Sequence, residues 1–187
     1  FKADLNTLLG VGIGGKTDAE ATKIFIDYLK AKREGKPTNP EYHQIADQLD
    51  AMVEKYQFTP EQHQEVVDYC VKKDVLFVST PFSMNEVDLL DRLGIPFFKI
   101  ASMDVNHLSL LEHVGSKGKP VIISTGMSTL GEIERALAIL RRAGSGPLCL
   151  LHCIAVYPPK YEDINLKNIQ MLQRAFDVPV GFSDHTQ

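Results

Sequence analysis

The feature of this 187-residue sequence that most restricts its fold is a regular alternation of short apolar runs with helical patterns. The apolar runs occupy residues 75–79, 97–100, 121–124, 148–151 and 178–181. Because they are apolar on both faces, they are typical of parallel strands that are covered on both sides. Strands that alternate with helices at intervals of roughly 22–30 residues predict repeated βαβ units, and therefore an α/β fold with a parallel sheet.

The segments between these runs carry signals for the start and the end of helices. Thr59 and Pro60 predict a helix that begins at Pro60, since threonine is a good N-cap and proline is favoured at the first helical position. Ser83 and Thr129 are each followed by a glutamate three residues later, which predicts two capping boxes. The helix after Thr129 is expected to end before Gly144. Its expected buried stripe consists of Ile133, Ala136, Leu137 and Leu140.

Polar side chains follow the apolar runs one after another. They include Ser79, Thr80, Lys99, Ser102, Ser124, Thr125, His152, Ser183, Asp184 and His185. Polar residues at the carboxyl ends of successive strands are typical of a barrel, whereas an open sheet concentrates them at one switch point, usually beside a glycine-rich phosphate loop. The glycine-rich stretch at 12–15 matches neither dinucleotide nor Walker motifs, so we expect a turn there. Residues 58–187 are therefore predicted to form the core of a TIM-type (β/α)8 barrel.

Residues 1–57 follow a different pattern. Helical periodicity is present at 19–32 and at 45–56, and the stretch 35–40 between them contains a glycine and prolines that predict a loop. Nothing in this region has the residue pattern of a catalytic site. We predict a separate helical and loop region at the surface of the protein.

Charge and composition exclude several classes of partner. A net charge of -4 disfavours nucleic acid, since phosphate neutralisation needs a basic surface. No apolar run approaches the roughly 20 residues that a membrane helix requires. The sequence has 3 cysteines and no C-x-x-C pair, which disfavours a disulfide framework or a zinc knuckle and favours a reducing compartment. We therefore expect a cytoplasmic protein that binds neither nucleic acid nor a membrane.

Lys99 stands out because it lies within an apolar run. Burying an unpaired cation would cost several kcal/mol, so an anionic partner is expected. The hydroxyls of Thr80, Ser102 and Ser124 follow the preceding, the same and the next strand, and would converge near Lys99 in a parallel sheet. One lysine with several hydroxyl donors suits a phosphate monoester. The alternative is that Lys99 extends to solvent and the serines cap helices.

Two histidines, His152 and His185, also lie at expected strand ends. A histidine in such a place can be a metal ligand, a general acid or base, or a packed imidazole. A divalent metal normally needs two or more protein ligands. The residues alone leave these three roles open.

A series of short blocks has a characteristic order and spacing. The blocks are 79–82 (STPF), 99–102 (KIAS), 118–127 (GKPVIISTGM), 151–153 (LHC), 157–158 (YP), 162–166 (EDINL) and 181–186 (GFSDHT). From about residue 57 to the end, this series resembles the N-acetylneuraminate (sialic acid) synthase family. Each block alone is a weak signal, but the blocks in register are specific. Heptulosonate and octulosonate synthases share the barrel but not this series.

The resemblance implies an enzyme, a carbon–carbon bond-forming transferase. Members of the family condense phosphoenolpyruvate with the aldehyde of an N-acylated, mannosamine-type hexosamine, forming a sialic acid-type nonulosonate and releasing phosphate. They use a divalent metal, manganese or magnesium, and form homodimers. For this chain the resemblance implies a role in polysaccharide biosynthesis, with the acceptor sugar left open.

The resemblance also assigns roles to residues. The phosphoenolpyruvate site that it implies consists of Thr80, Lys99, Ser102, Ser124 and Tyr157. It implies that Lys99 and His185 are catalytic, with His185 as a metal ligand. Where the family has Thr-Ser or Thr-Asn after His-Cys, this chain has Ile154 and Ala155.

The same resemblance implies that the chain holds a partial barrel, about strands 3 to 7 of the eight. The strand that carries the family's catalytic glutamate is expected before Phe1. The second metal histidine and an antifreeze-like C-terminal domain are expected after Gln187.

Two other functions stay open on the sequence alone. A Schiff-base aldolase with Lys99 as nucleophile also places a lysine in a barrel strand, and borohydride trapping would reveal it. A non-catalytic homologue or fragment is favoured by Ile154, by Ala155 and by the unusual first 57 residues. It would have no affinity for phosphoenolpyruvate.

Overall fold

The computed structural model describes residues 57–156 and 158–186. The chain divides into two compact units, Phe1–Thr59 and Pro60–Gln187, and every element named below belongs to the second. The helices predicted at 19–32 and 45–56 and the turn predicted at 12–15 lie outside the described residues.

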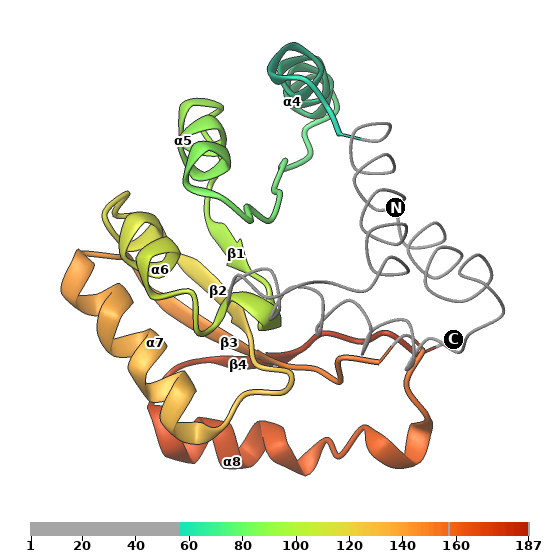
Figure 1. Ribbon diagram of the computed structural model, residues 1–187. Helices are drawn as coiled ribbons and strands as arrows, with labels where there is room; N and C mark the ends of the chain where they lie inside the picture. The colour runs from blue at the N-terminus through green and yellow to red at the C-terminus, as the bar shows by residue number, and fades with distance from the viewer. Residues whose placement is uncertain (1–56, 157, 187) are drawn as a thin grey trace, which may run out of the picture. The chain divides into compact units, whose positions relative to one another are not determined.

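The second unit is a parallel α/β structure in which helices connect successive strands (Figure 1). Its elements are α4 (Pro60–Lys72), α5 (Met84–Arg92), β1 (Phe98–Ile100), the 3-10 helix η1 (Ser102–Asp104), α6 (Leu108–Gly115), β2 (Val121–Ser124), α7 (Leu130–Ala143), β3 (Leu148–His152), the 3-10 helix η2 (Tyr161–Asp163), α8 (Lys167–Phe176) and β4 (Val180–Phe182). The strands pair in parallel in the order β1-β2-β3-β4. The predicted α/β fold with a parallel sheet is confirmed.

The core lies on one face of this sheet. Its strand residues are Phe98, Ile100, Val121, Ile123, Leu148 and Leu150, all buried. They belong to one apolar cluster with residues of α5 to α8, which follow one another along one side of the sheet in Figure 1. Burying each large apolar side chain stabilises the fold by about 1.5–3 kcal/mol. On the opposite face Lys99, Ile122 and Cys149 lie in register and are only half-buried. The described helices therefore cover one face of the sheet, which is the arrangement of helices in the predicted barrel.

The predicted helix signals are confirmed. Ser83 Oγ accepts a hydrogen bond from the Glu86 N–H, and Glu86 Oε2 accepts one from the Ser83 N–H. Thr129 and Glu132 form the same reciprocal pair at the start of α7. Helix α7 ends at Gly144, whose φ of 98° is a left-handed conformation that glycine adopts without strain. The predicted stripe, Ile133, Ala136, Leu137 and Leu140, is buried.

The strand predicted at 75–79 is wrong. The segment has no strand assignment in the structure, and β1 forms the edge of the described sheet. Val75 and Leu76 are 59% and 74% exposed, and only Phe77 packs against the core. An apolar run becomes a strand only when a neighbouring strand accepts and donates its backbone hydrogen bonds, and β propensity depends on that context.

The last strand is shifted relative to its prediction. The sequence placed it at 178–181, whereas β4 pairs from Val180 to Phe182 with residues 150–152 of β3. Pro179 has no N–H, so it cannot donate to the ladder, although its carbonyl accepts a bond from the Leu150 N–H. The shift places Ser183 directly after the strand.

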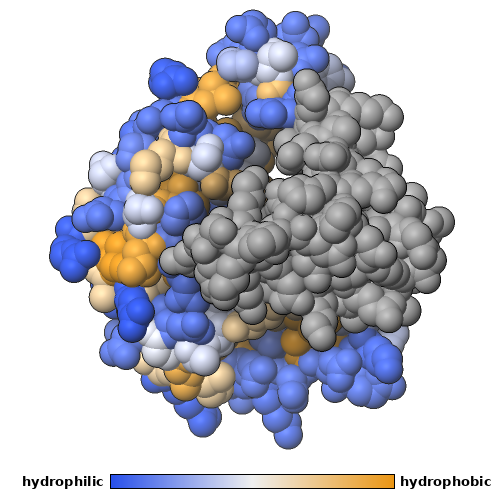
Figure 2. Space-filling model, viewed as in Figure 1, coloured by the Kyte–Doolittle hydropathy of each residue, from blue (hydrophilic) through white to orange (hydrophobic). Residues whose placement is uncertain are grey.

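Figure 2 shows one face of the described part. The face shown in Figure 2 is largely hydrophilic, with smaller apolar patches between charged side chains. Within residues 57–156 and 158–186, no helix has the length and apolar character needed to cross a membrane.

Candidate active site

The carboxyl ends of the four strands lie along one edge of the sheet because all the strands are parallel. Ser102 begins the 3-10 helix that follows β1, Ser124 ends β2 and His152 ends β3. His185 follows β4 after two intervening residues. Thr80 lies in the half-buried segment that leads to α5. Of the predicted site residues, Tyr157 lies outside the described residues.

Ser102 connects the ends of three strands. Its Oγ accepts a hydrogen bond of 3.0 Å from the Gly126 N–H, in the segment after β2. The same oxygen lies 3.2 Å from Cys153 Sγ, in the segment after β3. A Cβ added to Gly126 would lie 3.0 Å from Cys153 Sγ and 3.1 Å from Ser102 Oγ. A larger residue at position 126 would require Ser102 or Cys153 to shift.

Two neighbouring hydroxyl residues at the end of β2 have different environments. Thr125 is 7% exposed, and both its N–H and its Oγ1–H donate to the Leu151 carbonyl at 3.0 Å. Its hydroxyl therefore serves to join β2 to β3. Ser124 is 4% exposed and, two residues beyond Ile122, faces the side of the sheet that carries Lys99. From strand spacing and rise, the Cα atoms of Ser124 and Lys99 are about 8 Å apart, within reach of a lysine side chain.

Lys99 is the middle residue of β1 and faces away from the helical layer. Its neighbour in register is Ile122, followed by Cys149 on the next strand. Burial raises the pKa of the Cys149 thiol, which shows that this face is partly shielded from water. Among the ion pairs of the described residues, none joins a carboxylate to Lys99. The described part of the chain thus leaves the Lys99 ammonium to be paired by another anion.

The two histidines differ in their surroundings. His152 is 5% exposed, its Nε2 lies 2.6 Å from the Ile164 carbonyl and therefore donates to it, and its ring stacks on Phe182. These contacts make His152 a packed imidazole. His185 is half-buried, and its Nε2 lies 3.1 Å from Ser183 Oγ.

Lys99 and His185 belong to opposite edges of the described sheet. Strands β1 and β4 are separated by β2 and β3, which corresponds to about 14 Å in a flat sheet. The described contacts bring Ser102 together with the ends of β2 and β3, but do not join Lys99 to His185. A ligand that contacts both needs the sheet to curve.

The geometry of the carboxyl edge can be compared with known proteins. Residues 20–187 match the model of the NeuB family. This match covers most of the chain. The chain belongs to the NeuB family. The match begins well before residue 57, so it extends the predicted resemblance into the N-terminal region.

Individual relatives of this NeuB-family chain agree with the match. It is 41% identical over 138 residues to an N,N'-diacetyllegionaminic acid synthase of Campylobacter jejuni, which covers 73% of the chain and 41% of that protein. It is 39% identical over 180 residues to an uncharacterised protein of Methanocaldococcus jannaschii, which covers 94% of the chain and 51% of that protein. The chain therefore spans about half or less of these curated relatives.

A solved structure extends the agreement to three dimensions. The N-acetylneuraminic acid (sialic acid) synthetase of Leptospira borgpetersenii serovar Hardjo-bovis, determined with citrate, has a TM-score of 0.71 and 28% identity. The similarity covers 99% of this chain and 61% of that one. The predicted sialic acid synthase family is thus confirmed for the NeuB-family chain.

Asp104 is a residue at the same edge to which the sequence assigned no role. It is 8% exposed, and its Oδ2 is buried without a hydrogen-bond partner among the described residues. Its Oδ1 lies 3.7 Å from His107 Nδ1. Burial raises the pKa of Asp104 above its ordinary value. The sequence signal was its place two residues after Ser102, but burial cannot be read from that spacing.

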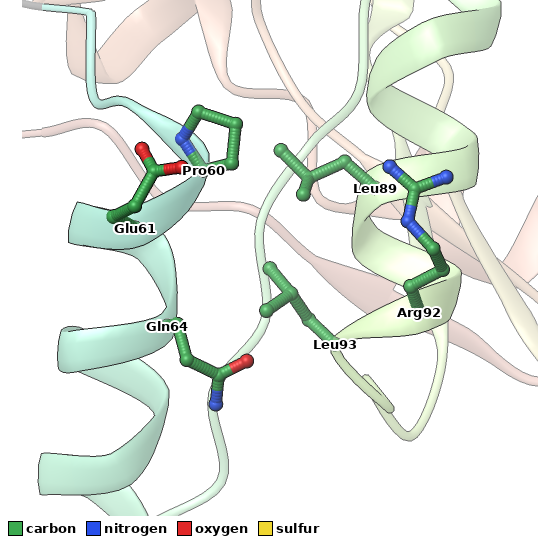
Figure 3. A pocket seen from close by; sticks show the side chains of 6 residues that line it. All are labelled: Pro60, Glu61, Gln64, Leu89, Arg92 and Leu93. Atoms are coloured by element: carbon green, nitrogen blue, oxygen red, sulfur yellow. The ribbon is translucent and has the colours of Figure 1, made fainter.

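A shallow cleft of about 310 Å³ lies between α4 and α5 (Figure 3). It is lined by Pro60, Glu61, Gln64, Leu89, Arg92 and Leu93. None of the predicted site residues lines it. The cleft belongs to the helical layer rather than to the carboxyl edge of the strands, so it does not compete with the edge as the candidate active site.

Proposed function

We propose that this chain is part of the catalytic barrel of an enzyme that condenses phosphoenolpyruvate with an N-acylated, mannosamine-type aldehyde. The product is a sialic acid-type nonulosonate, and phosphate is released. The observation that carries the proposal is the NeuB-family match over residues 20–187. A relative at 41% identity is named as a synthase of this type of sugar acid. Lys99 shares a face of the sheet with Ser124 and has no carboxylate partner among the described residues, which is consistent with an anionic substrate.

The sheet supports a barrel. Helices lie on one face, and the half-buried opposite face carries Lys99 and Ser124. In a (β/α)8 barrel the helix-free face becomes the interior, and the carboxyl edge carries the active site. Curvature of this kind would bring the end of β4 closer to β1. We propose that the described strands are part of such a barrel.

Within this site we propose that one group of residues holds phosphoenolpyruvate. The group consists of Thr80, Lys99, Ser102, Ser124 and Tyr157. The ammonium and the hydroxyls would bind the phosphate and then stabilise the charge that develops as the C–O bond to phosphate breaks. Donors placed in this way typically contribute ~2–4 kcal/mol each to transition-state stabilisation.

His185 is suited to a divalent metal, manganese or magnesium, because a neutral imidazole is a common metal ligand. Within residues 57–156 and 158–186, no group of three or more histidine, cysteine, aspartate or glutamate side chains could hold a metal ion. The described residues thus fit one ligand position rather than a complete site, and we propose His185 for that position. The metal, when bound, supplies a Lewis acid for the sugar aldehyde.

The assembly and location of the enzyme are part of the same proposal. We propose a cytoplasmic homodimer whose product enters surface polysaccharide synthesis. The acceptor is an N-acylated amino sugar, and the panel of candidates includes N-acetylmannosamine and di-N-acetylated hexoses.

The test is phosphate release from phosphoenolpyruvate by the full-length protein, with manganese and this panel of acceptors. The expected result is release that requires both one acceptor and the metal. No release by the folded protein with any acceptor would support a non-catalytic homologue. A covalent adduct trapped by borohydride with pyruvate would instead support an aldolase that uses Lys99.

A further inference from the structure

The hydroxyl of Ser102 has a limited set of hydrogen-bonding positions. A serine hydroxyl offers one O–H donor and two acceptor lone pairs. The Gly126 N–H, at 3.0 Å, occupies one lone pair. Cys153 Sγ, at 3.2 Å, takes either the second lone pair, if the thiol donates, or the hydroxyl proton, if the sulfur accepts.

A phosphate beside Ser102 favours one of these two hydrogen-bonding arrangements over the other. A thiol sulfur is a weak acceptor, whereas a phosphate oxygen accepts charge-assisted hydrogen bonds that are roughly twice as strong as neutral ones. The Ser102 O–H therefore forms a stronger hydrogen bond with the phosphate than with Cys153 Sγ. The thiol proton then turns to the remaining lone pair of Ser102. With both lone pairs occupied, the hydroxyl proton can point only away from Gly126 and Cys153.

The packing fixes this arrangement. Cys153 is 5% exposed, so water has little access to its sulfur as an alternative partner. Gly126 approaches both side chains so closely that an added Cβ would lie 3.0 Å from Cys153 Sγ and 3.1 Å from Ser102 Oγ. The three residues come from the ends of three different strands, so the direction of the hydroxyl is set by the register of the sheet.

We propose that Cys153 is a positioning residue for the phosphate of phosphoenolpyruvate. Its S–H donates to Ser102 Oγ and thereby directs the Ser102 O–H toward the phosphate. This inference rests on the proposed function, because it requires an anionic phosphate beside Ser102. Cys153 acts through Ser102 rather than on the substrate itself, so its effect exists only when the serine hydroxyl is present.

The experiment is a double-mutant cycle on the full-length protein, read as the Kd for phosphoenolpyruvate by isothermal titration and as KM and kcat. The variants are Cys153→Ala, Cys153→Ser, Ser102→Ala and Ser102→Ala with Cys153→Ala. Cys153→Ala is expected to raise Kd and KM about three- to tenfold, with a smaller change in kcat. Cys153→Ser keeps an O–H donor and should bind within about twofold of the unsubstituted enzyme. In the Ser102→Ala background, Cys153→Ala should have no further effect.

Two results would overturn the role of Cys153. One is that Cys153→Ala and Cys153→Ser weaken phosphoenolpyruvate binding equally. The other is an undiminished effect of Cys153→Ala in the Ser102→Ala background, which indicates packing alone. If Cys153→Ala does not fold, Cys153→Ser with and without Ser102→Ala provides the test, and a loss of phosphoenolpyruvate affinity well beyond twofold in Cys153→Ser would overturn the role of the donor. Lack of binding by the folded, unsubstituted protein is a different result and would refute the proposed function itself.

Discussion

The ends of β1, β2 and β3 are built differently from the end of β4. At the first three, Ser102 Oγ joins residues 24 and 51 positions away in the sequence, Gly126 and Cys153. After β4, His185 Nε2 contacts Ser183 Oγ, two residues away, and Asp184 accepts hydrogen bonds from Thr186. Long-range contacts of the first kind form only when the sheet is assembled in register. The contacts at the ends of β1, β2 and β3 therefore depend on the whole sheet, whereas the printed contacts after β4 lie within one turn.

The largest expected effect tests the phosphate region. Lys99→Ala is expected to lower kcat/KM for phosphoenolpyruvate roughly 30- to 1,000-fold, since a cationic donor to a departing phosphate is typically worth ~2–4 kcal/mol. Steady-state phosphate release measures it. The matched control is Lys119→Ala, because Lys119 Nζ is paired with Asp91 at 2.7 Å. Equal losses in both variants would show that the effect is not specific to Lys99.

Substitutions of the two histidines are expected to affect different properties, metal-dependent activity for His185 and stability for His152. His185→Gln is expected to lower metal-dependent activity at least tenfold. His152→Gln should lower the free energy of unfolding by about 2 kcal/mol, because His152 is buried, stacked and hydrogen-bonded. Urea unfolding and manganese titration of activity measure the two effects. Unchanged manganese dependence in His185→Gln would remove the metal assignment.

A pair of glycines tests how tightly the three-strand contact is packed. Gly126→Ala is expected to lower the free energy of unfolding by about 1–3 kcal/mol, since the added Cβ overpacks the contact. Gly131→Ala is the control, because an added Cβ there meets nothing within 4 Å and the position lies in α7. Alanine at Gly131, the second residue of α7, should change the free energy of unfolding by no more than about 0.5 kcal/mol. Equal effects of the two substitutions in urea unfolding would contradict the tight packing.

The smallest expected effect is the contribution of two aspartates to the pH dependence of the free energy of unfolding. The two contributions have opposite signs. Burial raises the pKa of Asp104, so its protonated form favours folding at low pH, and this contribution is lost as pH rises through the folded pKa. Hydrogen bonds from Thr186 hold the pKa of Asp184 below its ordinary value, so its contribution is present at neutral pH and lost as pH falls.

Substitution of each aspartate checks those signs. Asp104→Asn should raise the free energy of unfolding at pH 7 by about 1 kcal/mol, because it removes a buried charge with an unpaired oxygen. The gain should disappear near pH 3, where Asp104 is itself protonated. Asp184→Asn should give no gain at pH 7. A gain of equal size in both variants would show that burial does not distinguish the two carboxyl groups.

The sequence predicted those features that depend on neighbouring residues. The capping boxes at Ser83 and Thr129 and the end of α7 at Gly144 follow from contacts within a few positions, and all three are confirmed. The strand at 75–79 was wrong because pairing depends on a neighbour elsewhere in the chain.

Some features of the candidate site could likewise be predicted from the sequence, and others could not. The place of Ser102, Ser124 and His185 after successive strands could be predicted, because parallel strands end at one edge. The contact of Ser102 with Gly126 and Cys153 could not, because it depends on the register of three strands. The unpaired oxygen of Asp104 was likewise beyond prediction, since burial of a single carboxyl group depends on the packing around it.

The most direct test is a crystal structure of the full-length protein with phosphoenolpyruvate and manganese. The predicted result has phosphate oxygens within hydrogen-bonding distance of Lys99 Nζ and Ser102 Oγ, at the carboxyl edge of β1 and β2. Phosphoenolpyruvate bound elsewhere, for instance in the cleft between α4 and α5, with Lys99 paired to a protein carboxylate, would contradict the assignment of this edge as the active site.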